Sequence, residues 1–246
     1  TGFVIGDKIY VGTGAGKSFE VYNDFYAYDI NIDRWEPIAP LPDTTGGRKQ
    51  AFGFSLNGKG YILTGCGMSC STDTLRKDVW EYTPGPSGGN WIPKNDFFGD
   101  PRGGARGFLV DNQFYFGLGF MKDENNKPLY KRDFWKYIPE NDSWAKLPEL
   151  IGPGRGFFTG FVLNNKIYFG LGEEIFKNGS IRLFDDFYVF DPDNNSDPWT
   201  RCENDFFLEI AWNASASVED IGYIFFGAQD FLDNNTYKNN IWQFVP

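Results

Sequence analysis

The chain has 246 residues, of which 41% are hydrophobic and 23% are charged, and its formal net charge is −10. A chain of this length can bury a substantial core as one domain, so we expect a single domain over residues 1–246 and a monomer. The negative charge disfavours broad contact with nucleic acid or anionic lipid. No stretch approaches the roughly 18 apolar residues that a membrane-spanning helix needs, so no membrane insertion is expected.

Five copies of one unit follow each other along the chain. Each copy is marked by a tyrosine and by a glycine four residues later, and neighbouring tyrosines are 51 to 55 residues apart. The marker pairs are Tyr10 and Gly14, Tyr61 and Gly65, Tyr115 and Gly119, Tyr168 and Gly172, and Tyr223 and Gly227. Self-similarity at this period indicates stacked supersecondary units.

Each unit begins with two alternating segments that are joined by a two-residue turn, which predicts a tight β-hairpin. The turns are Gly6-Asp7, Asn57-Gly58, Asp111-Asn112, Asn164-Asn165 and Glu219-Asp220. Asn, Asp and Gly tolerate the positive φ that such turns require. Small residues also recur eight positions before the tyrosine, as in Gly53 and Gly107, and they suit strands crowded around an axis.

A third strand is predicted after a longer connection, and a fourth after a further turn. The third strands begin at Asp24, Asp78, Asp133, Asp186 and Asn240, and each is rich in alternating aromatic residues. The fourth strands are marked by Trp35, Trp91, Trp144 and Trp199. Four short strands per unit, with an aromatic face that one unit cannot cover alone, indicate blades stacked around an axis. Recurrence of the aspartates from blade to blade favours loop capping over catalysis.

The hairpin, the tyrosine, the glycine, and an aromatic residue followed by tryptophan resemble the kelch repeat over essentially the whole chain. The resemblance implies an all-β fold, a β-propeller of four-stranded blades. Five blades are visible, or six if an upstream repeat is missing, and we expect an upstream strand to complete the last blade. The usual kelch glycine doublet is altered, because other residues precede the retained glycine: Thr13, Thr64, Leu118, Leu171 and Phe226.

One face of the predicted propeller carries long, dissimilar connections between the second and third strands. They span about 15–23, 66–77, 120–132, 173–185 and 228–239. A rigid frame that presents such loops is typical of a binding surface. Arg48, Arg102 and Arg155 stand thirteen residues before their tyrosines, at the mouths of inner strands, and Arg106 and Trp212 are expected at the same mouth.

The resemblance implies that the three arginines hold an acidic ligand, since guanidinium pairs bidentately with carboxylate. Alternatively, they bond loop carbonyls between neighbouring blades. Both interpretations stay open at this stage.

Two functions are compatible with these residues. The first is a non-catalytic module that binds an acidic glycan or a peptide or protein ligand on the long-loop face. The second follows from the resemblance to kelch-type sialic acid mutarotases, in which a carboxylate and an arginine converge on an anionic sugar; Glu149, Glu209 and Asp100 are the candidate acids. No cofactor or metal is expected, because the copper of a kelch-fold oxidase needs histidine ligands and the chain has no histidine.

The three cysteines do not form a disulfide framework. Cys66 and Cys70 could close a small ring in an oxidising compartment or remain reduced thiols in a loop, and Cys202 is left over. The resemblance suggests an extracellular, periplasmic or cell-envelope protein.

Overall fold

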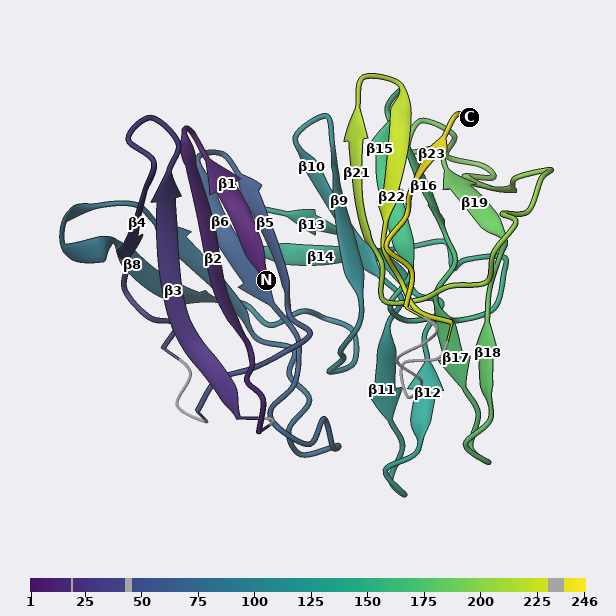
Figure 1. Ribbon diagram of the computed structural model, residues 1–246, viewed down its shortest axis with the longest axis horizontal. Helices are drawn as coiled ribbons and strands as arrows, with labels where there is room; N and C mark the ends of the chain where they lie inside the picture. The colour runs from purple at the N-terminus through teal and green to yellow at the C-terminus, as the bar shows by residue number, and fades with distance from the viewer. Residues whose placement is uncertain (19, 43–45, 230–236) are drawn as a thin grey trace.

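The computed structural model describes residues 1–18, 20–42, 46–229 and 237–246. Five antiparallel sheets follow each other in chain order, and the predicted all-β propeller is confirmed (Figure 1). Inner strands of consecutive sheets contact each other, from β1 with β5 to β15 with β21. The connection predicted at 228–239 falls partly on residues 230–236, which lie outside the described residues.

The first two sheets have the strand orders β1-β2-β3-β4 and β5-β6-β7-β8. Their strands are β1 (Gly2–Ile5), β2 (Lys8–Ala15), β3 (Val21–Asp29), β4 (Arg34–Pro37), β5 (Phe52–Leu56), β6 (Lys59–Leu63), β7 (Val79–Thr83) and β8 (Asn90–Lys94), with a 3-10 turn at Pro86–Gly88. The third sheet contains β9 (Arg106–Val110), β10 (Gln113–Gly117), β13 (Phe134–Ile138) and β14 (Ser143–Leu147). The predicted order of strands within a unit is therefore confirmed.

The fourth sheet contains β15 (Thr159–Leu163), β16 (Lys166–Gly170), β19 (Phe187–Phe190) and β20 (Trp199–Arg201). Among the described residues the fifth sheet has three strands, β21 (Ala214–Val218), β22 (Ile221–Phe225) and β23 (Ile241–Phe244). Two long connections also fold into hairpins that the sequence analysis did not predict, β11 (Phe120–Lys122) with β12 (Pro128–Tyr130) and β17 (Glu173–Ile175) with β18 (Ile181–Leu183). Both project from the same end of the propeller (Figure 1).

The tight hairpins form where the sequence places them. In the three middle sheets both turn residues have positive φ, between 47° and 74°, as type I′ turns require. The residues that replace the first glycine of the kelch doublet also have φ values of 57° to 61°. The chain thus keeps a left-handed backbone at a position where glycine is absent.

The marker glycine joins each sheet to the next one. Its N–H donates to a backbone carbonyl that leads into the following sheet: Gly14 to Arg48 (2.8 Å), Gly65 to Arg102 (2.8 Å), Gly119 to Arg155 (2.8 Å) and Gly172 to Ile210 (2.9 Å). A Cβ at Gly65, Gly119 or Gly172 would lie 2.6 to 2.7 Å from a backbone oxygen in the loop that leads into the glycine's own sheet. Close approach and positive φ together explain why the glycine recurs.

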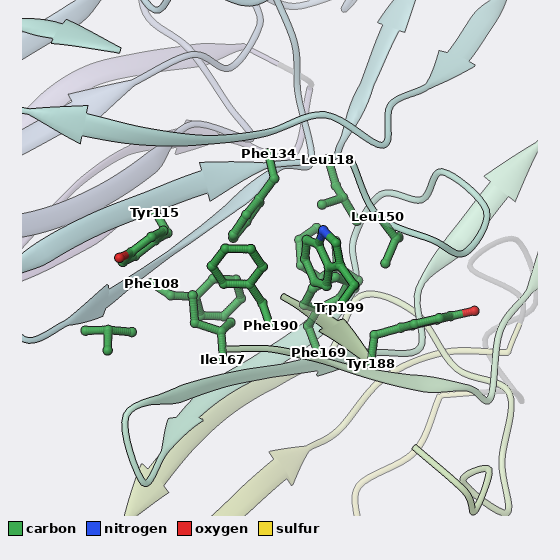
Figure 2. Close-up of a cluster of buried hydrophobic side chains, with 12 residues drawn as sticks. Phe108, Tyr115, Leu118, Phe134, Leu150, Ile167, Phe169, Tyr188, Phe190 and Trp199 are labelled. Carbon is green, nitrogen blue, oxygen red and sulfur yellow. The ribbon is translucent and has the colours of Figure 1, made fainter. Parts of the chain in front are cut away.

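Aromatic side chains fill the space between neighbouring sheets. Figure 2 shows the cluster between the third and fourth sheets, where Phe134, Phe169 and Trp199 are all buried. The indole N–H of Trp199 donates to the carbonyl of Pro148 in the preceding unit at 2.8 Å, which satisfies the polar edge of the buried ring. Trp91 donates in the same way to the carbonyl of Ala39 at 2.9 Å, so these two predicted outer-strand tryptophans pack between blades.

The first and fifth sheets each leave one face exposed. Ile241 in the fifth sheet is 61% exposed, whereas Phe134 at the equivalent position of the third sheet is 0% exposed. Likewise Val11 and Trp35 of the first sheet are exposed, although their equivalents in the fourth sheet are buried. Aromatic packing on both faces is a property of the three middle sheets.

We expect Gly119→Ala to destabilise the fold more than Gly179→Ala. The two glycines have φ values of 81° and 87°, so each alanine should cost roughly 1–2 kcal/mol in backbone strain. At Gly119 the new Cβ would also lie 2.6 Å from the carbonyl oxygen of Gly103, whereas nothing lies within 4 Å at Gly179. Urea unfolding measures both, and equal losses would contradict close packing at the marker glycine.

Candidate functional site

The three arginines predicted to bind a ligand lie in buried ion pairs. Arg48, Arg102 and Arg155 are 0% exposed. The guanidinium of Arg102 donates to both carboxylate oxygens of Asp133, at 2.7 Å each, and to the carbonyl of Leu118 at 2.9 Å. The same arrangement pairs Arg48 with Asp78 and Arg155 with Asp186.

A ligand-binding role for these arginines does not fit this arrangement, because their guanidinium groups are buried and engaged with aspartate. They do bond loop carbonyls, but within one unit rather than between blades: each arginine ties the loop before its inner strand to the start of the third strand. The repeated aspartates therefore have a structural role. The fifth unit carries Ile210 and Asn240 in place of the pair, so arginine and aspartate are lost together, a signal that was visible in the sequence.

Two aspartates of these pairs, Asp133 and Asp186, have lowered pKa values. Burial alone would raise the pKa of Asp133, but the hydrogen bonds and charge of Arg102 outweigh burial and lower it. The indole N–H of Trp135 also donates to this carboxylate at 2.8 Å. Asp186 has a lowered pKa for the same reasons, with Arg155 as its partner. These carboxylates are consequently poor candidates for proton transfer.

Four residues converge on the axis, and each stands two positions after one of the three arginines or after Ile210, which replaces the arginine in the fifth unit. Gln50, Gly104, Phe157 and Trp212 all have φ between 51° and 63°, a strained conformation for bulky side chains. Backbone N–H groups link three of them around the axis, from Phe157 to Gly104 (3.0 Å) and from Trp212 to Phe157 (3.2 Å). The Phe157 and Trp212 rings stack with centroids 3.6 Å apart.

These side chains line two adjoining pockets of about 310 and 300 Å³, which share Gln50, Phe157 and Trp212. We call the two pockets together the axial mouth. Arg106 lines the first pocket, and Glu173 and Lys122 line the second. The structure thus places Arg106 and Trp212 at the mouth where the sequence analysis expected them.

Arg106 is a desolvated cation at this mouth. Its Nη2 donates to the carbonyl of Asn213 at 2.6 Å and its Nη1 to Ser215 Oγ at 3.4 Å. Burial lowers the pKa of Arg106 to about 10, so the side chain remains charged at neutral pH. Within the described ranges no carboxylate forms an ion pair with it. Such a cation can bind an anionic ligand.

Glu173 is the buried carboxyl group of the mouth, and the sequence analysis missed it. Its side chain is 2% exposed and accepts hydrogen bonds from Trp212 Nε1 at 3.0 Å and from the Tyr130 hydroxyl at 3.3 Å. Burial raises the pKa of Glu173, and these two hydrogen bonds only partly oppose that effect. The sequence did hold a signal, since the residue after the marker glycine in the other units is Ala15, Cys66, Phe120 or Ala228.

Lys122 places a second titratable group in the pocket of Glu173. Its ammonium lies 5.9 Å from the centroid of the Phe120 ring, and burial lowers its pKa. One pocket therefore holds a carboxyl group whose pKa is raised and an amine whose pKa is lowered. Groups shifted in these directions are suited to exchanging protons with a bound molecule.

The three candidate acids from the sequence lie elsewhere. Glu149 accepts hydrogen bonds from Lys146 (3.1 Å) and Arg132 (3.2 Å), and the hydrogen bond from Lys146 is the main reason that its pKa is lowered. Asp100 pairs with Lys131 at 2.7 Å. Both line a separate groove on the third unit, and Glu209 is exposed in the loop before the fifth sheet. None of them lines the axial mouth.

Cys66 and Cys70 form a disulfide, and Cys70 lines the mouth beside Gln50. Across the ranges that the structure describes, no group of three or more His, Cys, Asp or Glu side chains is placed to hold a metal ion. In the same ranges no helix has the length and apolarity needed to cross a membrane.

Several sequence relatives are N-acetylneuraminate epimerases. The protein from Shigella sonnei is 29% identical over 141 residues, covering 56% of this chain and 36% of that protein. The protein from Salmonella typhi is 26% identical over 196 residues, covering 67% of this chain and 49% of its own length. The chain therefore spans between about a third and a half of these relatives. No protein-family model matches it.

The solved structure of YjhT superposes with a TM-score of 0.71 at 18% identity, over 99% of this chain and 80% of that one. The chain is a β-propeller that is distantly similar to N-acetylneuraminate epimerases. The similarity to YjhT shows a shared propeller fold. The similarity to the epimerases is one of sequence, at less than 30% identity over part of each chain.

We expect Arg102→Met to lower the free energy of unfolding by about 3–5 kcal/mol, because it leaves the Asp133 carboxylate buried without its partner. The matched control is Arg132→Met, which removes a solvent-exposed pair with Glu149 and should cost less than about 1 kcal/mol. The double variant R102M/D133M should regain much of the loss. Urea unfolding tests the series, and similar costs for both single variants would show that the buried pair is dispensable.

Glu173→Gln should change the pH dependence of stability. Because the pKa of Glu173 is raised in the folded state, its favourable contribution is complete below the unfolded pKa of about 4.3 and is lost as pH rises through the folded value. Glutamine does not titrate, so the stability of the variant relative to the native chain should increase from pH 4 to pH 8. Denaturation at both pH values measures this, and a constant difference would argue against a raised pKa.

Proposed function

We propose that the chain interconverts the anomers of a carboxylate-bearing sugar at the axial mouth, with N-acetylneuraminate as the first candidate. The observation that carries the proposal is the buried Glu173, whose pKa is raised, in a mouth that also contains Arg106 without a carboxylate partner among the described residues. The names of the sequence relatives support the choice of sugar.

The reaction requires two proton transfers and no redox chemistry. The anomeric hydroxyl loses a proton, the ring oxygen gains one, and the bond between the anomeric carbon and the ring oxygen breaks to give an open-chain ketone. Reclosure on the other face of the carbonyl returns both protons and yields the other anomer. A carboxyl group with a raised pKa can serve as acid in one direction and base in the other. Glu173 fills this role, and Lys122 is the second proton-transfer group.

The remaining features of the mouth would bind and orient the sugar. Arg106 pairs with the sugar carboxylate through its planar fork of N–H donors. The stacked rings of Phe157 and Trp212 offer an apolar surface to the C–H face of the sugar. Since the Trp212 indole also donates a hydrogen bond to Glu173, the indole ring and the carboxyl group are fixed relative to each other.

The sequence alone gave precedence to a non-catalytic binding module. Such a module would use Arg106 and the two rings, but it would not need a buried carboxyl group whose pKa is raised. Glu173 therefore favours the catalytic alternative. If the chain binds the sugar but does not accelerate anomer exchange, the interpretation as a non-catalytic binding module would be favoured.

Proton NMR of freshly dissolved α-anomer tests the activity. The native chain should accelerate conversion to the β-anomer above the rate in buffer, and Glu173→Gln should reduce the enzymatic rate by about 10²–10⁴ while binding persists. Arg106→Gln should mainly raise KM. Glu174→Gln is the matched control, because the neighbouring residue on β17 points to the opposite face of the strand. A native rate equal to that of buffer would refute the proposal.

A further inference from the structure

A groove of about 510 Å³ lies on the third unit, beside the axial mouth. We call it the Phe98 groove. It is lined by Phe98, Tyr130, Lys131, Trp135, Lys146 and Glu149, together with neighbouring residues of the same loops. Tyr130, at the end of β12, lines both this groove and the mouth, and its hydroxyl donates to Glu173. The groove therefore lies next to the mouth, with β12 between them.

The groove carries one more positive charge than negative charge once the buried Arg102–Asp133 pair is set aside. Lys131, Arg132 and Lys146 contribute three positive charges, and Asp100 and Glu149 contribute two negative ones. The remaining carboxylate in the lining, Asp133, is already neutralised by the buried Arg102. A local excess of positive charge is unusual on a chain whose formal net charge is −10, and it favours an anionic ligand.

The ion pairs of the groove are exchangeable. The side chains of Arg132, Lys146 and Glu149 are each more than 40% exposed, and pairs of this kind contribute little to stability. Glu149 bridges the other two, with distances of 3.2 Å and 3.1 Å. Its carboxylate occupies the position that the carboxylate of a ligand would take between these cations. Displacing it would cost little, because it would remain solvated.

An exposed aromatic ring completes the groove. Phe98 is 77% exposed, and its ring packs edge-on against Trp135 with centroids 5.8 Å apart. The ammonium of Lys146 lies 6.0 Å from the centroid of the Trp135 ring. An apolar ring next to cations suits a saccharide that has both a C–H face and a carboxylate.

We propose that the Phe98 groove is a second binding site, which holds a carboxylate-bearing saccharide separately from the axial mouth. The carboxylate pairs with Lys146 and Arg132 in place of Glu149, and the C–H face of the sugar packs on Phe98. This site does not depend on catalysis at Glu173, because it contains no buried acid. A saccharide whose anomeric carbon is blocked by a glycosidic bond would still bind there.

Isothermal titration with 3′-sialyllactose, and with lactose as the neutral comparison, tests the groove. Arg106→Gln removes the anchor of the mouth, so binding that remains in this variant reports on the groove. We expect it to retain affinity for 3′-sialyllactose that exceeds its affinity for lactose by about tenfold or more. Adding Phe98→Ala and Lys146→Gln should remove this preference. Both side chains are exposed, so these changes should leave the fold intact.

The fifth unit offers a matched control. Phe207 stands at the position equivalent to Phe98, is 70% exposed, and packs edge-on against Trp242. The fifth unit keeps Lys238 at the position of Lys131, but it has Asn239 where the third unit has Arg132. Phe207→Ala should leave 3′-sialyllactose binding unchanged. Equal effects of Phe98→Ala and Phe207→Ala, equal affinity for lactose, or tighter binding of a glutamate-rich peptide would each overturn the proposal.

Failure at the groove and failure at the mouth give different results. If anomer exchange proceeds in the native chain but the groove variants bind 3′-sialyllactose normally, only the second site is refuted. If 3′-sialyllactose binds at the groove while anomer exchange equals the buffer rate, only the proposed activity is refuted. In the F98A/K146Q variant, exchange of free N-acetylneuraminate should remain at the native rate.

Discussion

A buried arginine–aspartate pair at the long-loop end of each middle sheet holds the irregular part of the structure in place. A buried ion pair adds little net stability compared with apolar packing, but it strongly penalises any arrangement in which one partner is left alone. In this propeller each pair fixes the loop before an inner strand against the start of the third strand. The backbone carbonyl of the same arginine also accepts a hydrogen bond from the N–H of the marker glycine in the preceding sheet. These contacts also fix the positions of Gln50, Gly104 and Phe157, which follow the arginines by two residues and lie toward the axis.

The axial mouth is built from backbone that a regular sheet would not allow. Left-handed conformations at Phe157 and Trp212 turn two large rings toward each other, and this strain is tolerated because hydrogen bonds on both sides fix the chain. Glu173 is buried beside Trp212, so it loses solvation, and within the described part of the chain no cation forms an ion pair with it. Burial of the carboxyl group is thus a consequence of the same packing that shapes the mouth.

Two regions on the long-loop face concentrate positive charge on an otherwise acidic chain. At the mouth Arg106 is desolvated, while in the Phe98 groove Arg132 and Lys146 are exposed and paired with Glu149. We propose proton transfer on a small sugar at the first site and reversible binding of a larger saccharide at the second. Tyr130 is the physical link between them, since it lines both and donates to Glu173.

The sequence by itself determined the propeller, because period-2 strands, tight turns and a recurring tyrosine and glycine are local signals repeated five times. It also indicated the mouth through Arg106 and Trp212. It could not establish that Arg48, Arg102 and Arg155 are buried, since their aspartate partners stand 30 or 31 residues away and only folding brings them together. The same holds for Glu173, whose pKa is raised by burial: the tertiary structure packs it against Tyr130 and Trp212 from two other units, although their hydrogen bonds partly oppose that rise. A repeat can be recognised from residues that are close in sequence, whereas desolvation of a charged group depends on side chains that are distant in the sequence.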